Sequence, residues 1–484
     1  MNQSINQFSA LQLLENKSFF KIAFVTYSSI NLIPIINIQF FTRVFLVFFA
    51  LWGAAIVGYD LFVRKLRNYK PILLMIAFLA VCLISYLVNF RREGLTNIIR
   101  LAFSALSILI LFLNDDHSPE HVKWELYRLN LCYSLVTFAC VIVSLVFFAL
   151  NIHFEIIGRI GSTVRFGFLE NRLFGVFSSS NIGGSYCFAS IAAVLMNRFF
   201  LGKDLSKGMK RYYLANLILC YIYIALSLSR GTYLSCSVAI VTVLLLIELP
   251  TKLLALFQNK ILWARIASIA ASLLLFFVGM EIVQVISSVV PVGVYNVKAA
   301  VIHIFNPGWS GEEPEVIDFV RIETGKKDVT NGRTDIWKAS FSLLKGDLLF
   351  GVGSSDINPE DTAYIESNRL TDREVQILDR FNGNSHNGYL QILVECGVFA
   401  LLLFLAFFVR CFIKWLKSYP RLRQDRGVWQ LSVLLLAVVV YFLANNMVET
   451  NFMLMGTNTF QCLLWVNAGY LYYLIDRTNS QTNQ

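Results

Sequence analysis

Long apolar segments separated by short polar ones run along almost the whole chain. Apolar segments of 17 or more residues recur, each long enough to cross about 30 Å of hydrocarbon as a helix. Helices satisfy their own backbone hydrogen bonds in lipid, and the alternating short strands of a membrane barrel are absent from the sequence. We therefore expect an all-α polytopic membrane protein. Its twelve predicted spans lie near residues 22–38, 44–63, 71–90, 98–114, 129–152, 179–200, 212–228, 231–250, 266–290, 389–413, 428–447 and 458–475.

One long polar segment, residues 291–388, interrupts this pattern. We expect it to form an extracytoplasmic loop that contains short helices and caps a site at the membrane. The chain then has three parts. Residues 1–290 carry spans one to nine with short loops, residues 291–388 form the loop, and residues 389–484 carry spans ten to twelve and a cytoplasmic tail.

Basic residues in the short loops predict the orientation of the spans. The basic loops follow the second, sixth, eighth and tenth spans, and with twelve spans all four loops fall on the same side of the membrane. Their basic residues are Arg64, Lys65, Arg67, Lys70, Lys203, Lys207, Lys210, Arg211, Lys252, Lys260, Arg265, Lys414, Lys417, Arg421, Arg423 and Arg426. Such residues mark the cytoplasmic side, so both termini are expected there. Arg91 and Arg92 fall on the opposite side and are exceptions. The first 19 residues are polar and lack a cleavage pattern, so the first span is expected to remain as an anchor.

Composition narrows the class of function. The chain has 484 residues, 56% of them hydrophobic, and a net charge of +10 that at first suggests a nucleic-acid partner. The loop 291–388 holds 10 Lys and Arg against 15 Asp and Glu, so the basic excess lies in short loops beside the membrane. That distribution is typical of orientation signals and contacts with anionic lipids, not of nucleic-acid binding. All nine cysteines lie in apolar segments, so neither a disulfide framework nor a cysteine-based metal site is indicated.

Arg230 lies between Ser229 and Gly231 at the junction of the seventh and eighth predicted spans. Arg211 precedes it by 19 residues and Glu248 follows it by 18, helical distances of about 28 and 27 Å. Because these distances are close to the thickness of the hydrocarbon core, we expect Arg230 in a tight turn at the opposite membrane face. Its guanidinium would then be placed to bind an anion; the alternative is an arginine that extends from a helix end to water.

Arg172 belongs to the expected outward loop 153–178, which also holds Arg159 and Arg165. An excess of basic residues on the extracytoplasmic side runs against the rule that Lys and Arg gather in cytoplasmic loops. Gly175 permits close backbone approach, and Arg172 offers a bidentate fork to phosphate or to a sugar carboxylate. The alternative is a solvated loop with chance basic residues.

Arg333 opens a short stretch with helical spacing, in which Ile336, Trp337, Phe341 and Leu344 recur. A helix start offers free N–H groups and a favourable dipole to an anion, and Arg333 would add a full charge. The alternative is a local pair between Arg333 and Asp335. The Gly-x-Gly at residues 351–353 is weak support for a phosphate loop.

His386 lies in a polar turn immediately before the tenth span, followed by Asn387. Near neutral pH a histidine can act as a free base that accepts a proton from a hydroxyl group. As a single loop histidine it carries little weight, and its neighbouring motifs must support the assignment.

The chain carries four short motifs in this order: Arg172-x-x-Gly175 with Asn181, Ser229-Arg230-Gly231, Gly332-Arg333-x-x-Ile336-Trp337, and His386-Asn387-x-x-Leu390 with Glu395 and Gly397. The ordered set resembles the O-antigen ligase and O-antigen polymerase superfamily over residues 170–410. The number of spans and the single long outward loop agree with this resemblance.

The resemblance implies glycosyl transfer without metal or cofactor at the extracytoplasmic face of a bacterial inner or plasma membrane. The donor would be an oligosaccharide linked to undecaprenyl pyrophosphate. By motif, Arg230 and Arg333 would bind the pyrophosphate and His386 would be the catalytic base. Arg172, Asn181 and Asn387 would be weaker substrate contacts.

We favour a polysaccharide polymerase, whose acceptor is another lipid-linked repeat unit. The alternative within the superfamily is an O-antigen ligase that uses lipid A–core or another acceptor. An alternative of another class, a transporter of lipid-linked oligosaccharide, predicts charged residues deep in the spans, whereas Glu281 and Glu449 lie towards the outer ends. The expected partners are the lipid-linked donor and membrane lipids, with a chain-length regulator and a flippase as further candidates and no nucleic acid.

Overall fold

The computed structural model describes residues 16–31, 33–34, 39–62, 70–90, 94–114, 118–157, 163–201, 205–306, 311–312, 314–319, 332–345, 347–355, 365–366, 369–450 and 459–480. The chain divides into two compact units. The first unit comprises Met1–Ser28, Phe40–Ser118 and Lys326–Gln484, and the second comprises Ser29–Gln39 and Pro119–Gly325. Several basic residues used above lie outside the described residues: Arg64, Lys65, Arg67, Arg91, Arg92, Arg159 and Lys203.

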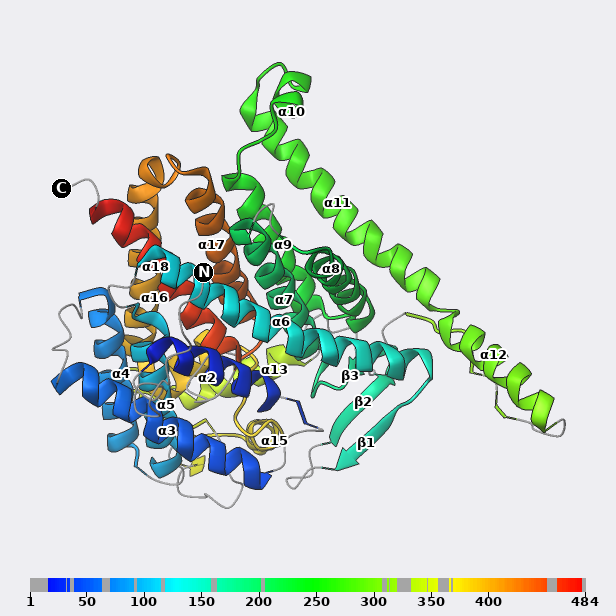
Figure 1. The fold of residues 1–484 in the computed structure, drawn as a ribbon. Helices are drawn as coiled ribbons and strands as arrows, with labels where there is room; N and C mark the ends of the chain where they lie inside the picture. Colours follow the sequence, from blue (N-terminus) through cyan, green and yellow to red (C-terminus); the bar gives the residue numbers. More distant parts are fainter. Residues whose placement is uncertain are drawn as a thin grey trace, which may run out of the picture. The chain divides into compact units, whose positions relative to one another are not determined.

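The first unit is a bundle of helices around α16 (Gly388–Leu422), which packs against α4 (Leu73–Val88) and α18 (Thr459–Ser480) (Figure 1). Aromatic side chains fill its core; for example, the ring centroids of Phe407 and Trp465 lie 5.8 Å apart. The other elements that lie wholly or mostly in this unit are α2 (Lys17–Asn31), α3 (Gln39–Phe62), η1 (Lys70–Ile72), α5 (Gly94–Ser107), η2 (Ile108–Phe112), α13 (Arg333–Leu343), α15 (Asp372–Arg380) and α17 (Arg426–Asn445).

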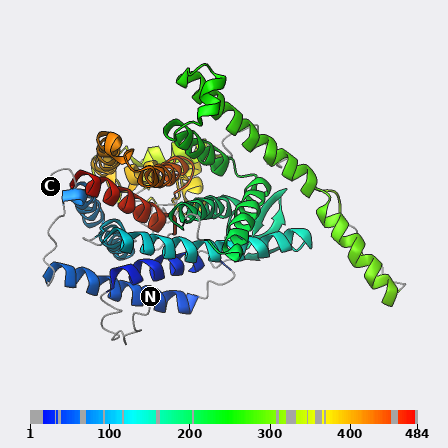
Figure 2. The same ribbon diagram turned by 45° about the horizontal axis from the view of Figure 1, so that its top comes forward.

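The second unit is built on three helices that pack together, and a further, long helix contacts one of these three and a neighbouring helix. Its helices are α6 (Pro119–Ala149), α7 (Ser180–Leu201), α8 (Lys207–Ser227), α9 (Arg230–Leu246), α10 (Thr251–Leu256), α11 (Ile261–Ser287) and α12 (Val290–Phe305). Helices α6, α7 and α8 form the packed group, and α11 contacts α8 and α9. Helix α12 follows α11 as a further length of helix in both views (Figures 1 and 2). It occupies the first part of the segment 291–388.

Each of the twelve predicted spans overlaps a described helix. Among the described residues, seven helical stretches are long and apolar enough to cross a membrane: Arg43–Phe62, Lys70–Val88, Gly94–Phe112, Pro119–Ala149, Ile261–Phe305, Gly388–Leu422 and Arg426–Asn445. Helix α9 is apolar but has only 17 residues. The protein is therefore a helical membrane protein with several spans, whereas the count of twelve is not confirmed and stays a prediction.

Helices α7 and α8 are less apolar because they carry polar side chains that bond to one another and to α6. Ser190 donates to Asn216 Oδ1 at 3.0 Å, and the Asn216 amide donates to the Ser134 carbonyl at 3.3 Å. The Asn130 amide donates to Asn197 Oδ1 at 3.2 Å. Polar groups that find partners between helices are tolerated within a membrane bundle, and they lower the hydropathy of the sequence without exposing polar atoms to lipid.

The segment predicted as the outward loop 153–178 contains a small antiparallel sheet, which corrects the all-α expectation. Its strands, in the order β1-β2-β3, are β1 (Phe154–Ile157), β2 (Thr163–Leu169) and β3 (Arg172–Gly175). The β-branched and aromatic residues of β2 favour a strand, and Phe166 stacks on its register partner Phe154 with ring centroids 4.8 Å apart. Sheet is a minor part of a mostly helical chain.

A kink in α16 receives part of the long polar segment. Helix α16 bends at Gly397, whose φ of 81° and ψ of 178° are not helical. The N–H of Val352 donates to the Val394 carbonyl at 2.8 Å, and the N–H of Gly353 donates to the Glu395 carbonyl at 2.9 Å. Residues 351–353 therefore hold the segment against α16, which explains their glycines without a phosphate.

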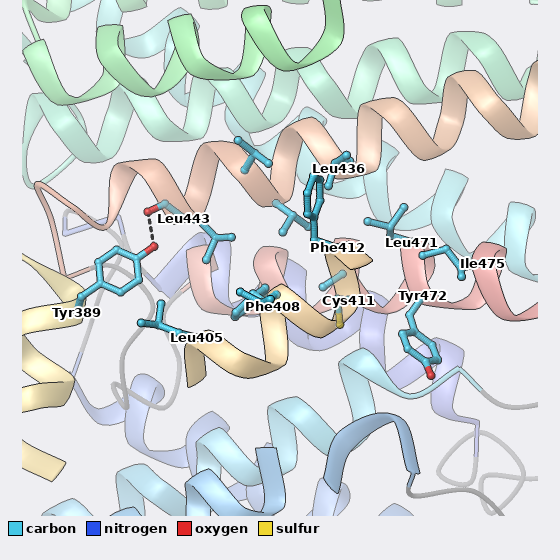
Figure 3. Close-up of a pocket in the computed structure, with 14 residues that line it drawn as sticks. Tyr389, Leu405, Phe408, Cys411, Phe412, Leu436, Leu443, Leu471, Tyr472 and Ile475 are labelled. Atoms are coloured by element: carbon cyan, nitrogen blue, oxygen red, sulfur yellow. Dashed lines mark hydrogen bonds between the residues drawn. The ribbon is translucent and has the colours of Figure 1, made fainter. Parts of the chain in front are cut away.

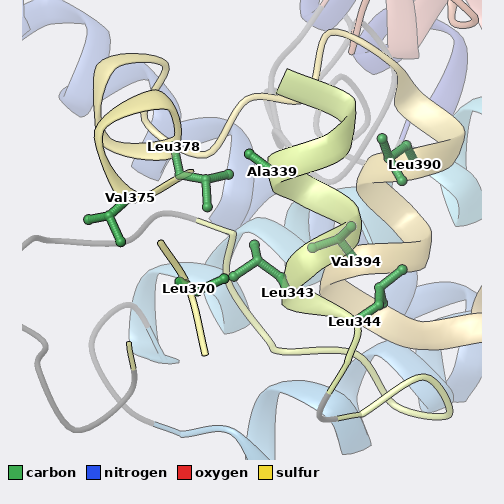
Figure 4. Packing of buried hydrophobic residues seen from close by; sticks show 8 residues of the cluster. All are labelled: Ala339, Leu343, Leu344, Leu370, Val375, Leu378, Leu390 and Val394. Atoms are coloured by element: carbon green, nitrogen blue, oxygen red, sulfur yellow. The ribbon is translucent and has the colours of Figure 1, made fainter. Parts of the chain in front are cut away.

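An apolar cluster fixes α13 and α15 on the first turns of α16 (Figure 4). Its buried members come from all three helices and from Leu344 and Leu370 outside them: Ala339, Leu343, Leu344, Leu370, Val375, Leu378, Leu390 and Val394. Burial would raise the pKa of Glu374 at the start of α15, but hydrogen bonds from Ser342 and Thr371 outweigh it, and the pKa lies below its usual value. This part of the predicted loop is thus a folded cap on one end of α16.

Replacing Gly397 by Ala should destabilise this arrangement. A Cβ there would lie 2.0 Å from the Leu349 carbonyl oxygen, and the left-handed φ adds strain of about 1–3 kcal/mol. We expect a clearly lower thermal unfolding temperature for the purified Gly397→Ala protein. Gly293→Ala in α12 is the matched control, because its Cβ would meet nothing within 4 Å. Equal unfolding temperatures for the two variants would contradict the role assigned to Gly397.

Candidate functional site

His386 lies in a tight turn that its neighbours define. Its backbone φ is 48°, a left-handed value that is uncommon for a residue with a side chain. Its N–H donates to Asn384 Oδ1 at 2.9 Å. Asn387 caps α16, because its side-chain oxygen accepts from the N–H groups of Tyr389 at 3.0 Å and Leu390 at 3.1 Å. The turn therefore presents the imidazole at the start of α16.

The carboxylate of Glu449 lies between His386 and Arg333. Glu449 Oε1 accepts from Arg333 Nη2 at 2.8 Å, and Glu449 Oε2 lies 3.4 Å from His386 Nδ1. The side chain of Glu449 is 13% exposed, that of Arg333 is 23% exposed and that of His386 is 30% exposed. Three segments distant in the sequence thus meet in a partly buried charged cluster that solvent can still reach.

This geometry suits the imidazole for accepting a proton. A carboxylate facing Nδ1 favours the tautomer with the proton on Nδ1, so that Nε2 remains an acceptor. It would also stabilise the imidazolium that forms when Nε2 takes up a proton. The 3.4 Å separation is long for a hydrogen bond, and catalytic contacts of this kind often shorten when the substrate binds.

Arg333 begins α13, as the sequence predicted, but its partner differs from the local alternative. The alternative, a local pair with Asp335, is wrong: Asp335 pairs with Arg373 at 3.0 Å, and Arg333 pairs with Glu449. In the sequence, Glu449 stands out only by its place near the outer end of a predicted span. The sequence gives no local signal for this contact, because 116 residues separate the two partners.

Trp337 links α13 to the histidine turn. Its indole N–H donates to the Ser385 carbonyl at 3.0 Å. Thr450, the residue after Glu449, donates to Asn384 Oδ1 at 2.8 Å. Both sides of the charged cluster are therefore tied to the same short turn, which limits how far His386 can move from Glu449.

Arg230 lies in the second unit at the tight turn that the sequence predicted. Helix α8 ends at Ser227, Leu228 takes a left-handed φ of 47°, and α9 begins at Arg230. Ser229 caps α9 by accepting from the N–H of Thr232 at 3.2 Å. Arg230 itself is exposed at the first position of the helix.

Arg172 and Asn181 hold this turn from the neighbouring elements. The guanidinium of Arg172 donates to the Ser227 carbonyl at 3.3 Å, to Asn181 Oδ1 at 3.2 Å and to the Ser180 hydroxyl. The Ser229 hydroxyl donates to the same Asn181 oxygen at 2.7 Å. The described contacts of Arg172 are thus internal ones that join β3, α7 and the α8–α9 turn. Binding of substrate by Arg172, Asn181 and Asn387 stays a prediction.

Arg165, on the sheet, pairs with both of the acidic residues of this segment. Arg165 pairs with Glu155 at 3.0 Å across β1 and β2, and also with Glu170 at 3.1 Å. Arg165 is therefore compensated at the surface, whereas Arg172 reaches the α8–α9 turn.

The predicted site residues thus fall into two groups. His386, Arg333 and Asn387 belong to the first unit, where Glu449 contacts both His386 and Arg333. Arg230, Arg172 and Asn181 belong to the second unit, where Arg172 and Asn181 support the turn that carries Arg230. That both groups act on one substrate stays a prediction.

An apolar cavity of about 310 Å³ lies between α16, α17 and α18 (Figure 3). Tyr389, three residues after His386, lines one end of it, and its hydroxyl donates to the Leu443 carbonyl at 2.7 Å. The remaining lining is almost wholly aliphatic or aromatic, including Phe408, Phe412 and Leu471. Such a lining suits a hydrocarbon chain.

Comparison with known proteins identifies one family. Residues 215–405 match the family model described as O-antigen ligase. This range contains Arg230, Arg333 and His386, and it confirms the resemblance drawn from the motifs. A search of curated proteins found no match.

Removing the Arg172 side chain should loosen the α8–α9 turn. Hydrogen bonds from a charged group contribute about 1.5–3 kcal/mol, so Arg172→Ala should lower the free energy of unfolding by about that amount. Arg165→Ala is the matched control, because its surface ion pairs are worth about 0–1 kcal/mol. Thermal unfolding of the two purified proteins measures the difference, and equal losses would show that the Arg172 network does not hold the turn.

Proposed function

We propose, on the premise that this chain belongs to the O-antigen ligase and polymerase superfamily, that it transfers a lipid-linked oligosaccharide to an acceptor hydroxyl at the membrane. The observation that carries this proposal is the cluster of His386, Glu449 and Arg333. It combines a base, a group that orients the base, and a cation within reach of solvent. Glycosyl transfer from a pyrophosphate needs a base for the acceptor and cations for the leaving group.

In the proposed reaction, Nε2 of His386 accepts the proton of the acceptor hydroxyl. The hydroxyl oxygen attacks the anomeric carbon of the donor sugar and forms the new glycosidic bond. The bond between that carbon and the phosphate oxygen breaks, and lipid pyrophosphate leaves with the bonding electrons. A single displacement of this kind inverts the anomeric configuration. Glu449 stabilises the imidazolium formed in this step.

Arg333 and Arg230 are the proposed pyrophosphate contacts. A guanidinium has several N–H donors, and the ion pair with Glu449 engages Nη2 of Arg333, so others can meet a phosphate oxygen. Arg230 lies exposed at the start of α9, where helix N–H groups also favour an anion. Held arginines can stabilise the charge of the leaving group, which is the basis for proposing metal-independent transfer.

The cavity between α16, α17 and α18 offers a place for the first part of the donor's lipid chain. Its end at Tyr389 is three residues from His386, and its apolar lining matches an isoprenoid chain. We propose undecaprenyl pyrophosphate as the carrier, with transfer at the extracytoplasmic face of a bacterial inner or plasma membrane. Both termini would be cytoplasmic, as the distribution of basic loop residues predicts.

Within the superfamily we favour a polymerase, in which the acceptor is a second lipid-linked repeat unit. The alternative is a ligase that transfers the glycan to lipid A–core or another acceptor. A flippase would supply the donor in either case, and a chain-length regulator is a further candidate partner of a polymerase.

Replacing His386 by Ala should remove the base. Loss of a general base costs about 10²–10⁴-fold in rate, so transfer should fall by that factor while donor binding stays near normal. His303→Ala, an exposed histidine on α12, is the matched control and should keep full activity. Product formation and donor binding by purified protein measure the two effects. An active His386→Ala enzyme would remove His386 as the base.

Incubating purified protein with its lipid-linked repeat unit alone should decide between the candidate functions. A polymerase forms a ladder of chain lengths, because the repeat unit is both donor and acceptor. A ligase forms product only when a second acceptor is added, and a transporter forms no new bond in either mixture. Activity that disappears with a chelator and returns with a divalent ion would contradict metal-independent transfer.

A further inference from the structure

Glu395 is a carboxylate on an apolar helix that the proposed reaction does not use. It lies in α16, two residues before the kink at Gly397, and it is only partly exposed. Its Oε1 accepts from Gln391 Nε2 at 2.7 Å and from the Ser355 hydroxyl at 3.0 Å. A carboxylate in such a setting is costly unless it is hydrogen-bonded, so its presence invites a functional explanation.

The neighbours of Gln391 allow one orientation of its amide. Nε2 faces three acceptors: Glu395 Oε1 at 2.7 Å, Ser355 Oγ at 2.6 Å and the Gly383 carbonyl at 3.2 Å. The reversed amide would place its oxygen against the Gly383 carbonyl, which has no proton to donate, and its NH2 group against the Ser385 N–H, which cannot accept one. Gln391 is 8% exposed, so water has little access to relieve such a clash.

The fixed amide orientation reaches the histidine turn. With Nε2 directed at Glu395, the Gln391 oxygen accepts from the N–H of Ser385 at 2.9 Å. Ser385 precedes His386 and is buried, and its carbonyl is the one that receives the Trp337 indole. The left-handed φ of His386 depends on such contacts, because an isolated chain disfavours it.

We propose that Glu395 is a positioning residue for His386 and acts through Gln391. Its carboxylate sets the Gln391 amide, the amide oxygen holds the Ser385 N–H, and the held turn keeps the imidazole against Glu449. The proposal rests on the proposed function of His386 as a base. In this proposal Glu395 does not contact the substrate. Its replacement should therefore change the rate of the chemical step and leave the binding of the donor unchanged.

Exchanging the two side chains tests this arrangement. Gln391→Glu should place two carboxylates face to face, and their repulsion should displace the side chain that accepts from the Ser385 N–H. A shift of the base by about 1 Å costs about 10²-fold in kcat. Glu395→Met, which removes the acceptor at similar size, should act alike. Glu395→Gln should stay close to wild type, because its amide oxygen can still accept from Gln391. The double variant Gln391→Glu/Glu395→Gln should recover activity, with the amide and the carboxylate in exchanged positions.

Ser85→Ala is the matched control, since the Ser85 hydroxyl donates to the backbone carbonyl of Glu395 at 2.7 Å and does not contact the carboxylate. It should leave kcat within a few-fold of wild type. In all variants KM for the donor should be unchanged. A double variant no more active than Gln391→Glu, or a Glu395→Met protein with wild-type kcat, would overturn the proposal.

Hydrogen exchange of the Ser385 amide provides a second readout that needs no turnover. Exchange should be faster in Gln391→Glu and Glu395→Met than in wild type, and near wild type in Glu395→Gln and in the double variant. Unchanged protection in every variant would refute the positioning role even if the wild-type protein is an active transferase. If the variants differ from wild type in exchange as expected but the wild-type protein forms no product, the proposed function is refuted and the hydrogen-bond chain stands.

Discussion

The carboxylate of Glu449 is the group on which the arrangement of the candidate site depends. A partly buried carboxylate needs partners, and Glu449 finds Arg333 at 2.8 Å and His386 at 3.4 Å. Its own backbone carbonyl accepts from the N–H of Gly388 at 3.1 Å, so the segment that carries it is also fastened to the start of α16. One residue thereby joins the first turn of α13, the histidine turn and the segment after α17.

The apolar packing beneath this cluster explains how a loop histidine can be held precisely. Leu343, Leu378 and Leu390 bring α13, α15 and α16 together, and the kink at Gly397 receives the backbone of residues 348–353. These contacts hold α13 and α15 on α16, and the hydrogen bonds of Trp337 and Gln391 then fix the turn that carries His386. A base supported by a packed core and by a second layer of hydrogen bonds is better placed than one on a free loop.

Much of the fold followed from the length and composition of the apolar segments, because a helix that crosses lipid needs both. The helix at Arg333 and the turn at Arg230 were also predictable, since their signals are local. The sheet of residues 154–175 was missed because its strands are short and lie in a segment judged by charge. The partner of Arg333 was missed because it is 116 residues away, and only tertiary structure chooses between it and Asp335.

The central claim is that Glu449 acts through His386. The most direct test compares kcat of wild type, His386→Ala, Glu449→Gln and the double variant at saturating donor. Groups that act as a unit are strongly non-additive, so Glu449→Gln should lower kcat in wild type and cause a much smaller loss once His386 is Ala, where only its pair with Arg333 is affected. An equal, independent loss in both backgrounds would contradict the account and leave Glu449 as a separate contributor.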